Sequence, residues 1–414
     1  MAKAIIIGAG IIGLSSAYYL RQAGWDVTVL EKGDLTDNCS FGNAGMIVPS
    51  HFVPLAAPGM LEKGIKWMFN SRSPFYVRPS LNPALIGWGL KFMKSANQQQ
   101  AEKAAVPLRD ISLLSKDLYA DLTVKIGDFG LSNNGILMLY KTDRVEEEEL
   151  HTAEQARALG LDAVSLSAVE AKQLQPGLEL DVKGAVHYRC DAHLNPNLLL
   201  ALLQRNLQES GVEILKNMEV TKVVQEKGQI TSVIAAGQEY AADHYVLATG
   251  SWSPEVAKRA GFKIPLMPGK GYSFMVDDTQ KNMHIAALLC EAKVSVTPMG
   301  GRIRFGGTME IDAINDRINI NRVKGIVASI PAYLPGFRPD LPEKKDIWFG
   351  FRPCSPDGLP YLGNSKVLRN LTVATGHGMM GVSLGPATGK LVSELVNGAP
   401  LSMDIQPFSP DRYS

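Results

Sequence analysis

The chain has 414 residues, 45% of them apolar and 20% charged, which excludes a disordered protein and predicts a packed one of about two domains. The 42 Lys and Arg residues balance 41 Asp and Glu residues, and a formal net charge of +1 excludes the basic surface typical of nucleic-acid-binding proteins. The four cysteines form no C-x-x-C pair, so we expect no metal site, no disulfide framework and a reducing compartment, the cytoplasm.

The N-terminal residues predict a β-α-β unit, the building block of parallel sheets. Residues 3–7 have the pattern of a buried strand, residues 11–23 that of a helix, and residues 25–31 that of a second strand. A secretory signal is the alternative for the apolar stretch 4–20. Three glycines interrupt that stretch and no small-x-small cleavage site follows it, which favours the β-α-β unit.

The turn between the first strand and the first helix has the spacing G-x-G-x-x-G. Its residues are Gly8, Ala9, Gly10, Ile11, Ile12 and Gly13. In this pattern the first glycine allows a tight turn, the second lets the backbone approach a pyrophosphate, and the third lets the helix pack on the strand. The N–H groups and the dipole at the helix start favour the anion. The turn therefore predicts a dinucleotide site, and the alternative is a glycine-rich turn in an ordinary α/β domain.

Two charged residues, Glu31 and Lys32, stand at the end of the second strand. Glu31 follows Gly13 by 18 residues, where a carboxylate can accept hydrogen bonds from ribose hydroxyls. The same carboxylate would repel a 2′-phosphate, so this position disfavours NADP and leaves FAD or NAD.

The middle of the chain lacks an evident strand–helix alternation and predicts a second, less regular part. Residues 49–83 are rich in Pro and Gly, and residues 98–125 predict a helix with a solvated outer face. The acidic run 146–149 is typical of a solvated helix surface. Residues 265–304 alternate in polarity as the strands of an antiparallel sheet do.

The C-terminal part repeats the strand, glycine turn and helix of the N-terminus. Residues 245–250 and 371–375 predict buried strands, and a last helix extends to residue 395. We therefore expect an α/β protein with a discontinuous Rossmann-like nucleotide-binding domain and an α+β substrate domain built on an antiparallel sheet. The predicted boundaries are 1–50, 190–262 and 346–414 for the nucleotide-binding domain, and 51–189 and 263–345 for the substrate domain.

A second glycine cluster precedes the last helix and favours FAD over NAD. Its residues are Gly376, His377, Gly378, Met379, Met380 and Gly381. The positive end of the helix dipole there would stabilise the negative charge that a reduced flavin gathers at N1 and the C2 carbonyl. A nicotinamide ring has no matching need.

Several motifs along the chain are similar to those of a known family. They are IIIGAGIIGLSSAYYL, SFGNAGMIVPS, PLAAPG, IKWMF, KGYSF, RIRFGGTMEI, GFRPCSPDGLP, TGHGMMG and the closing RYS. Through them essentially the whole chain resembles the FAD-dependent D-amino acid dehydrogenases, within the wider group of glycine oxidase and D-amino acid oxidase.

The resemblance implies further residues around FAD. They are Ser40, Asn43, Ala44, Gly45 and Met46 at the flavin and pyrophosphate, Val220 at the adenine through its backbone, and Thr249, Gly250 and Trp252 at the dinucleotide. The alternative for residues 40–46 is a simple turn, because Gly and Asn are common in turns. Cys354 does not occupy the position of the covalent flavin cysteine in the related sarcosine oxidases, so we expect FAD to be bound non-covalently.

The resemblance also implies three residues at the substrate. Arg352 is similar to the family's substrate-carboxylate arginine, and a guanidinium offers two parallel donors to a carboxylate. Tyr272 resembles a tyrosine near the substrate, and His51 follows the flavin-lining loop. The alternatives are a surface salt bridge for Arg352, an ordinary strand aromatic for Tyr272 and a structural histidine for His51.

The expected reaction is the FAD-dependent oxidative deamination of a D-amino acid. A hydride moves from the substrate Cα to flavin N5, and water hydrolyses the imino acid to a 2-oxo acid and ammonia. The segment DAHLNP at 191–196 differs from the best-known members and leaves open a cyclic substrate, D-proline or hydroxy-D-proline. The resemblance favours a quinone or respiratory-chain electron acceptor, and an oxygen-using glycine or D-amino acid oxidase is the alternative.

Residues 55–94 interleave aromatic and basic side chains. The aromatic ones are Trp67, Phe69, Phe75, Trp88 and Phe92, and the basic ones are Lys63, Lys66, Arg72, Arg78, Lys91 and Lys94. Such a stretch predicts either peripheral contact with the inner face of the cell membrane or a helical subdomain whose aromatics fill a core.

Overall fold

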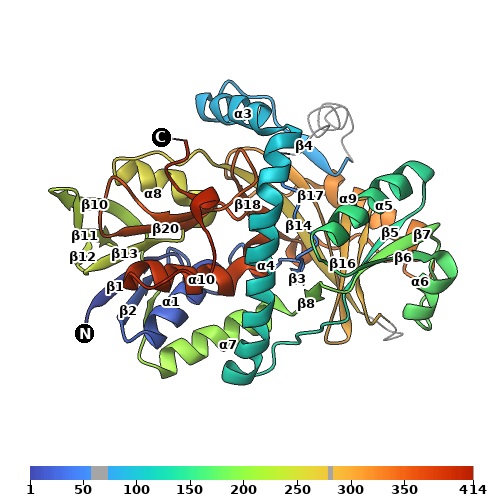
Figure 1. Cartoon of the computed structure of the whole chain (residues 1–414), viewed down its shortest axis with the longest axis horizontal. Helices are drawn as coiled ribbons and strands as arrows, with labels where there is room; N and C mark the ends of the chain where they lie inside the picture. Colours follow the sequence, from blue (N-terminus) through green and yellow to red (C-terminus); the bar gives the residue numbers. More distant parts are fainter. Residues whose placement is uncertain (57–72, 278–282, 414) are drawn as a thin grey trace.

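Two large sheets lie side by side in the protein (Figure 1). The structure is a computed structural model that describes residues 1–56, 73–277 and 283–413. The sheet at the left of Figure 1 contains the N-terminal strand, and the sheet at the right is built largely from the middle of the chain.

The first sheet has six strands in the order β19-β20-β13-β1-β2-β9. Their bounds are β1 Lys3–Ile7, β2 Asp26–Leu30, β9 Glu213–Leu215, β13 His244–Leu247, β19 Tyr361–Asn364 and β20 Leu371–Thr375. All neighbours run parallel except β19, which is antiparallel to β20. The central strands are apolar because a parallel sheet is buried on both faces. The predicted α/β fold with a Rossmann-like sheet is therefore confirmed.

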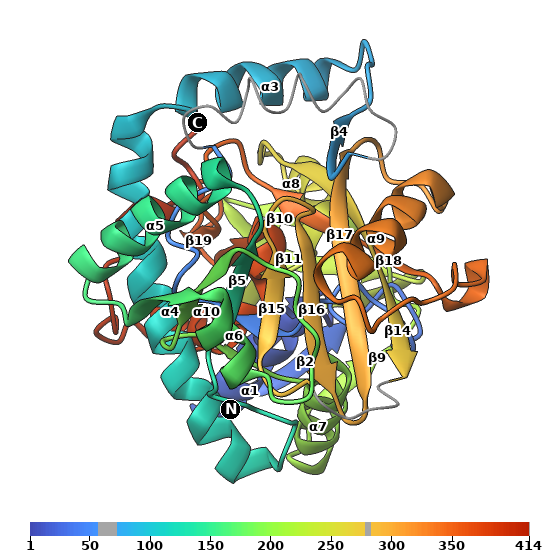
Figure 2. The ribbon, with the colours of Figure 1, turned by 90° about the vertical axis from the view of Figure 1, so that its right-hand side faces the viewer.

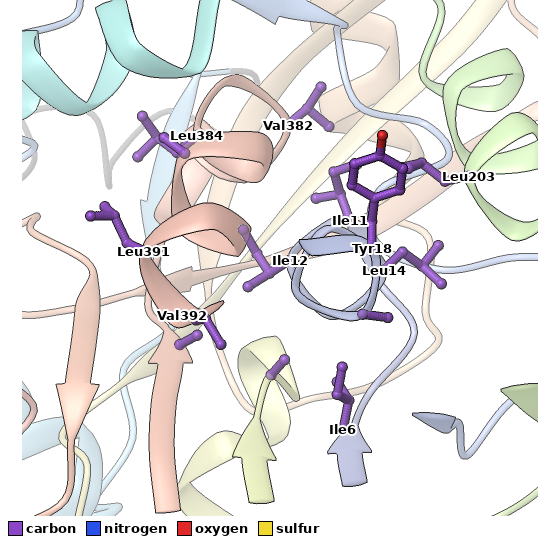
Figure 3. Close-up of a cluster of buried hydrophobic side chains, with 14 of the residues drawn as sticks. Ile6, Ile11, Ile12, Leu14, Tyr18, Leu203, Val382, Leu384, Leu391 and Val392 are labelled. Carbon is purple, nitrogen blue, oxygen red and sulfur yellow. The ribbon is translucent and has the colours of Figure 1, made fainter. Parts of the chain in front are cut away.

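Four helices pack together beside this sheet. They are α1 Ile11–Gln22, α4 Gln98–Ile126, α7 Pro196–Glu209 and α10 Gly381–Asn397. The approach of α1 and α10 is so close that a side chain at Gly389 would meet the backbone of Ser15 at 2.5 Å. Ile12 of α1 points toward α10 (Figure 3), and apolar side chains of both helices, Leu391 and Val392 among them, belong to one buried cluster. This packing holds the N-terminal ends of both helices, where the glycine clusters lie, against one sheet.

The second sheet has nine strands, eight of them in the order β18-β14-β17-β16-β15-β5-β7-β6, with β4 paired to β17 (Figure 2). Their bounds are β4 Phe75–Val77, β5 Ile136–Tyr140, β6 Ala163–Ser167, β7 Gly184–Tyr188, β14 Met267–Asp277, β15 Ala286–Leu289, β16 Val294–Met299, β17 Arg302–Ile311 and β18 Trp348–Cys354. Most pairs are antiparallel, as the alternating pattern predicts, but β5–β15 and β4–β17 are parallel. The helix α9 (Ile320–Tyr333) contacts β17 and shares an apolar core with this sheet.

The remaining elements are short strands and peripheral helices. They are β3 Met46–Ile47 paired with β8 Ala192–His193, the antiparallel set β10 Val220–Glu226, β11 Gln229–Ala235 and β12 Gln238–Tyr240, and the helices α3 Pro83–Ser95, α5 Asp143–Ala158, α6 Ala168–Leu174 and α8 Ser253–Arg259. Within the described ranges, no helix has the length and apolar character needed to cross a membrane.

Residues 136–188 are more regular than the sequence analysis expects. Strands and helices alternate there as β5, α5, β6, α6 and β7. The helical pattern of α5 is hidden because only Val145, Ala153 and Ala156 of its 16 residues are buried, and β6 is alternately covered and exposed. Weak apolar periodicity of this kind gives little signal for either element.

The domain boundaries stay a prediction, and two elements cross them. The helix α4 falls in the predicted substrate domain, yet its buried residues join the core of α1, α7 and α10. The strand β18 falls in the predicted FAD-binding domain, yet it pairs with β14 in the nine-stranded sheet. Since β18 contains Arg352, this arginine reaches the site from the nine-stranded sheet.

Candidate active site

Residues of both large sheets line a cavity of 1310 Å³. Ligand sites for one small molecule usually measure about 300–1,000 Å³, so this cavity has room for a cofactor and a substrate together. The structure places 23 of the 26 residues predicted from the sequence on its wall. The three that do not line it are Ala9, Gly13 and Gly45.

The first glycine turn has the geometry that its spacing predicts. Gly8 has φ +105°, and a side chain there would meet the carbonyl oxygen of Ala248 at 2.6 Å. A side chain at Gly13 would meet the carbonyl oxygen of Gly8 at 1.9 Å, so Gly13 serves the packing of helix on strand. No side chain caps the start of α1, although Ser40 Oγ accepts a hydrogen bond from the backbone N–H of Ile11.

The carboxylate of Glu31 ties the end of β2 to this turn. Its Oε2 accepts from the backbone N–H of Ala9 at 2.7 Å, and its Oε1 accepts from Gly33 at 2.8 Å. Each carboxylate oxygen keeps a second lone pair, so a ribose hydroxyl can still donate to Glu31.

The loop 40–46 is held from the nine-stranded sheet. Arg304, which is 7% exposed, donates through Nη1 to the carbonyls of Phe41 at 2.9 Å and Asn43 at 2.7 Å. Ser273 Oγ donates to the carbonyl of Gly42 at 2.8 Å. Residues 40–46 therefore form more than a free turn, since donors from β14 and β17 fix their backbone.

The segment 191–196, whose sequence differs from the best-known family members, lies beside residues 45–50, which continue this loop. Asp191 accepts from the backbone N–H of Ser50 at 3.0 Å and from its hydroxyl at 2.6 Å. Burial raises the pKa of Asp191 to about 7, and the hydrogen bonds from Ser50 oppose that shift. The strands β3 and β8 pair, and the N–H of Leu194 donates to the carbonyl of Gly45. The segment thus positions the loop from Gly45 to Ser50.

The second glycine cluster places another helix start on the cavity. All of residues 376–381 line it, and no side chain caps α10. The ring nitrogen Nε2 of His377 lies 3.0 Å from Thr388 Oγ1, within α10. Burial lowers the pKa of His377 to about 3, so the imidazole is neutral and anchors the turn.

The cofactor end of the cavity fits a dinucleotide bound to a flavin. Two uncapped helix starts offer backbone N–H groups to anions at separate places on the wall. Asn38, which also lines the cavity, has a buried Nδ2 that finds no hydrogen-bond partner in the described part of the chain. Lys32 lies 3.4 Å from the ring centroid of Trp252, and both line the wall near Val220. These residues would hold FAD between the first sheet and the loop 40–46.

Arg352 stands on β18 with its guanidinium on the cavity side. A side chain at Gly271, on the neighbouring strand, would come within 2.0 Å of Arg352 Nη1. Nη1 donates to the carbonyl of Thr308 at 2.8 Å. Among the residues that the structure describes, Arg352 forms no ion pair with a carboxylate, which sets it apart from a surface salt bridge. Burial lowers the pKa of Arg352.

Tyr272 borders the cavity, but the structure does not bring its hydroxyl to Arg352. The hydroxyl accepts from the backbone N–H of Asn319 at 3.0 Å. Its ring is 1% exposed and belongs to the core that includes Phe274 and Ile326 of α9. Because side chains alternate along a strand, Tyr272 points to the face of β14 opposite that of Gly271. Tyr272 packs as a strand aromatic that also borders the cavity, and its place near the substrate stays a prediction.

His51 lines the cavity, as do Glu149, Tyr188 and Lys293. Burial lowers the pKa of His51 to about 4, and the charge of Lys293 lowers it further. Burial raises the pKa of Glu149. The Nδ1 of His51 and the hydroxyl of Tyr188 are buried and have no hydrogen-bond partner among the described residues. Two members of the acidic run 146–149, Glu148 and Glu149, line the cavity, so the run is not only solvated helix surface.

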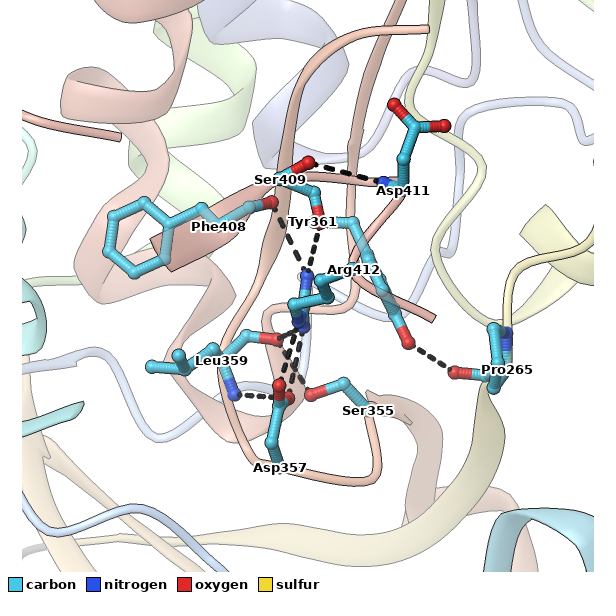
Figure 4. A network of polar contacts seen from close by, with 9 residues as sticks. All are labelled: Pro265, Ser355, Asp357, Leu359, Tyr361, Phe408, Ser409, Asp411 and Arg412. Carbon is cyan, nitrogen blue, oxygen red and sulfur yellow. Dashed lines mark hydrogen bonds and ion pairs between the residues drawn. The ribbon is translucent and has the colours of Figure 1, made fainter. Parts of the chain in front are cut away.

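The loop after Arg352 is fixed by the C-terminus of the chain (Figure 4). Arg412 donates to both carboxylate oxygens of Asp357, at 2.7 and 2.9 Å, and to the carbonyl of Leu359. Its guanidinium also lies 3.9 Å from the ring centroid of Tyr361. The motifs GFRPCSPDGLP and RYS, which are far apart in the sequence, thus form one network behind Arg352.

Sequence reasoning missed several cavity residues. Thr308, Gly271, Glu149, Tyr188 and Lys293 line it without having been singled out. Thr308 lies in the motif RIRFGGTMEI and Gly271 in the motif KGYSF. The family resemblance therefore pointed to these two segments but not to the two residues themselves. The other three come from α5, β7 and the turn before β16, whose place beside the cavity depends on the sheet order.

Nearly the whole chain is similar to known proteins. Residues 3–395 match the family described as FAD dependent oxidoreductase. A D-amino acid dehydrogenase of Helicobacter pylori is 32% identical over 397 residues, which are 95% of this chain and 94% of the relative. One from Bradyrhizobium diazoefficiens is 28% identical over 419 residues, 100% of this chain and 99% of the relative. The crystal structure of glycine oxidase from Geobacillus kaustophilus has the same fold, with a TM-score of 0.81, 23% identity and 100% of both chains covered.

Proposed function

The chain belongs to the FAD-dependent oxidoreductase family, and we propose that it is a D-amino acid dehydrogenase whose Arg352 binds the substrate carboxylate. The activity is the FAD-dependent oxidative deamination of D-amino acids to 2-oxo acids and ammonia. One observation supports it above the others: Arg352, with no carboxylate partner in the described chain, shares a cavity with both glycine-rich helix starts.

The residues of this chain bind and orient the substrate. Two parallel N–H groups of the Arg352 guanidinium bind the α-carboxylate, which fixes the direction of Cα. His51 lines the same cavity, and its pKa of about 4 leaves the imidazole neutral at physiological pH. The unpaired Nδ1 of His51 can accept a hydrogen bond from the amine. Bound FAD supplies the acceptor for the hydride of Cα.

Stereochemical preference and flavin reduction test this function together. Holoenzyme is mixed without oxygen with D-alanine, L-alanine, D-proline, hydroxy-D-proline, glycine and sarcosine in turn, and the flavin absorbance is followed. We expect bleaching by D-alanine and none by L-alanine. A yellow protein that no D-amino acid bleaches would be a non-catalytic flavoprotein, and bleaching by the cyclic substrates alone would replace the proposed substrate class.

The electron acceptor is proposed to be a quinone of the respiratory chain. The relatives in Helicobacter and Bradyrhizobium bear the name dehydrogenase, which supports an acceptor other than oxygen. Reoxidation of the reduced enzyme by a soluble quinone is compared with reoxidation by air-saturated buffer. Reoxidation that is faster in air, with one hydrogen peroxide formed per turnover, would show an oxidase instead.

The helix α3 is the proposed contact with a membrane surface. Trp88 and Phe92 fill a core, since they are buried, stack on each other at 5.1 Å and lie against Met267 and Cys354. The opposite side of α3 exposes a row of apolar side chains, Ile86 at 48%, Leu90 at 59% and Met93 at 50%. Their spacing of four and three residues puts them on one face, beside the exposed Lys94. Trp67 and Phe69, also predicted to contact lipid, lie outside the described residues.

Figures 1 and 2 both show α3 at the outer edge of the molecule, as a surface contact requires. Flotation with vesicles of phosphatidylcholine and phosphatidylglycerol tests the contact. The variant with Ile86, Leu90 and Met93 all changed to Ser is expected to remain in the soluble fraction. A control with Val124 and Val169, exposed at 88% and 67% on other elements, changed to Ser is expected to float like wild type. Equal flotation of both variants would contradict the contact.

A further inference from the structure

A residue beside Arg352 has a backbone conformation that its type rarely adopts. Thr308 in β17 has φ +62°, in the left-handed region. A β-branched side chain is a genuine outlier there, since only glycine adopts this region freely. Strained residues persist where the surrounding structure forces them, and they gather at binding and catalytic sites.

A β-bulge causes this conformation. Lys270 pairs with Glu310, but Tyr272 pairs with Gly307, so β17 places one extra residue opposite Gly271. The extra residue lets the N–H of Met309 donate to the carbonyl of Pro74, at the start of the parallel pair with β4. Bulges redirect side chains and backbone groups near active sites.

The bulge turns two groups of Thr308 toward the site. Its carbonyl oxygen accepts from Nη1 of Arg352 at 2.8 Å. Its hydroxyl Oγ1 belongs to a residue that lines the cavity and is only 8% exposed, and it has no hydrogen-bond partner in the described structure. A buried hydroxyl without a partner is costly, and such an atom in a binding cavity indicates a ligand group.

We propose that Thr308 is a substrate-binding residue, whose carbonyl fixes the Arg352 guanidinium and whose hydroxyl donates to the same α-carboxylate. This inference rests on the proposed function of Arg352. The carboxylate has more acceptor lone pairs than the two N–H groups of the guanidinium use, so it can accept one further donor. The Thr308 carbonyl is already occupied by Arg352, so the unpartnered hydroxyl is the polar side-chain group of Thr308 that remains for the ligand.

The test measures binding of propionate to holoenzyme by calorimetry, because propionate has the carbon skeleton of D-alanine without the amine that is oxidised. Thr308→Val removes the hydroxyl and nearly keeps the shape, and Thr308→Ser keeps the hydroxyl. We expect propionate to bind at least tenfold more weakly to Thr308→Val, with unchanged FAD content, and to bind Thr308→Ser nearly as tightly as wild type. Wild-type affinity in Thr308→Val would overturn the inference.

A second variant keeps the test independent of folding. Thr308→Gly relieves the backbone strain, so it should unfold at a temperature no lower than wild type while it also loses propionate affinity. A lower unfolding temperature with full affinity would assign Thr308 a packing role and overturn the inference. Flavin reduction of wild type by D-alanine separates the two claims. If wild type is not reduced but Thr308→Val still loses propionate, the proposed oxidation fails and the carboxylate site stands.

Discussion

The guanidinium of Arg352 occupies the space that a side chain at Gly271 would fill, with Nη1 only 2.0 Å from the position of such a Cβ. The two residues stand on the paired strands β18 and β14. The missing side chain of Gly271 therefore leaves room for the Arg352 guanidinium over β14. Thr308 accepts a hydrogen bond from this guanidinium and lies on β17, the strand that pairs with the other edge of β14.

This relationship predicts the effect of Gly271→Ala. The added methyl would push aside the end of a flexible side chain rather than backbone, so the free energy of unfolding should fall by about 1 kcal/mol or less. The displaced guanidinium should raise KM for D-alanine at least tenfold while FAD content is unchanged. Steady-state kinetics and the flavin spectrum measure both. Gly336→Ala, where nothing lies within 4 Å, is the matched control and should resemble wild type.

The first glycine turn predicts a different outcome for Gly13→Ala. Here the methyl would meet the carbonyl oxygen of Gly8 at 1.9 Å, and backbone cannot move as a side chain does. We expect a loss of about 3 kcal/mol in the free energy of unfolding, the upper part of the usual cost of overpacking, and purification without bound FAD. Gly89→Ala, in open space on α3, is the control. A yellow Gly13→Ala protein of wild-type stability would contradict the role given to this turn.

The contact between Asp191 and Ser50 predicts a contrast between two substitutions. Asp191→Ala leaves the buried N–H of Ser50 without an acceptor, which should cost about 1–3 kcal/mol of stability and loosen the loop next to His51. Asp191→Asn can accept from that N–H and donate to the hydroxyl, so it should be mild. Chemical denaturation and FAD affinity compare the two, and equal losses would argue against the role of these hydrogen bonds.

The same pair predicts a pH dependence. The folded-state pKa of Asp191, about 7, exceeds the ordinary value of 3.8. The protonated carboxyl therefore contributes stability below about pH 4, and this contribution is lost as the pH rises through 7. The stability of wild type relative to Asp191→Asn should accordingly fall between pH 4 and pH 8. A difference that stays constant across this range would show that Asp191 titrates at its ordinary pKa.

Buried histidines predict the opposite trend at acidic pH. Burial lowers the pKa of His244 to about 4, and its Nε2 lies 2.8 Å from Thr372 Oγ1. Since the unfolded chain takes up the proton near pH 6.5, the stability contributed by neutral His244 should be lost as the pH falls toward 4. Stability relative to His244→Gln should decrease by on the order of 2 kcal/mol between pH 7 and pH 4. The exposed His151→Gln is the control.

Much of the cofactor end could be predicted because its signals are local. The turn 8–13 and the cluster 376–381 each place glycines between a strand and a helix, and such spacing determines the backbone wherever the unit lies. The substrate end depends on tertiary packing instead. Period-two alternation shows that Tyr272 and Gly271 face opposite sides of β14, but it does not show which side faces Arg352.

Three further features lay beyond the sequence for physical reasons. The bulge at Thr308 shifts the register by one residue, and nothing in the alternation of residues 302–311 marks it. Glu149 sits in an acidic run, and its place on the cavity wall follows from the packing of α5 on β5, β6 and β7. The place of β18 in the nine-stranded sheet follows from a long-range pairing with β14.

The concentration dependence of anaerobic flavin reduction by D-alanine, compared between wild type, Arg352→Met and Arg352→Lys, shows directly whether Arg352 binds the substrate carboxylate. If Arg352 binds the carboxylate, Arg352→Met should keep FAD and its spectrum but need at least a hundredfold more D-alanine for half-maximal reduction, with Arg352→Lys in between. If Arg352→Met is reduced by D-alanine at wild-type concentrations and rates, the carboxylate is bound elsewhere and the account is wrong.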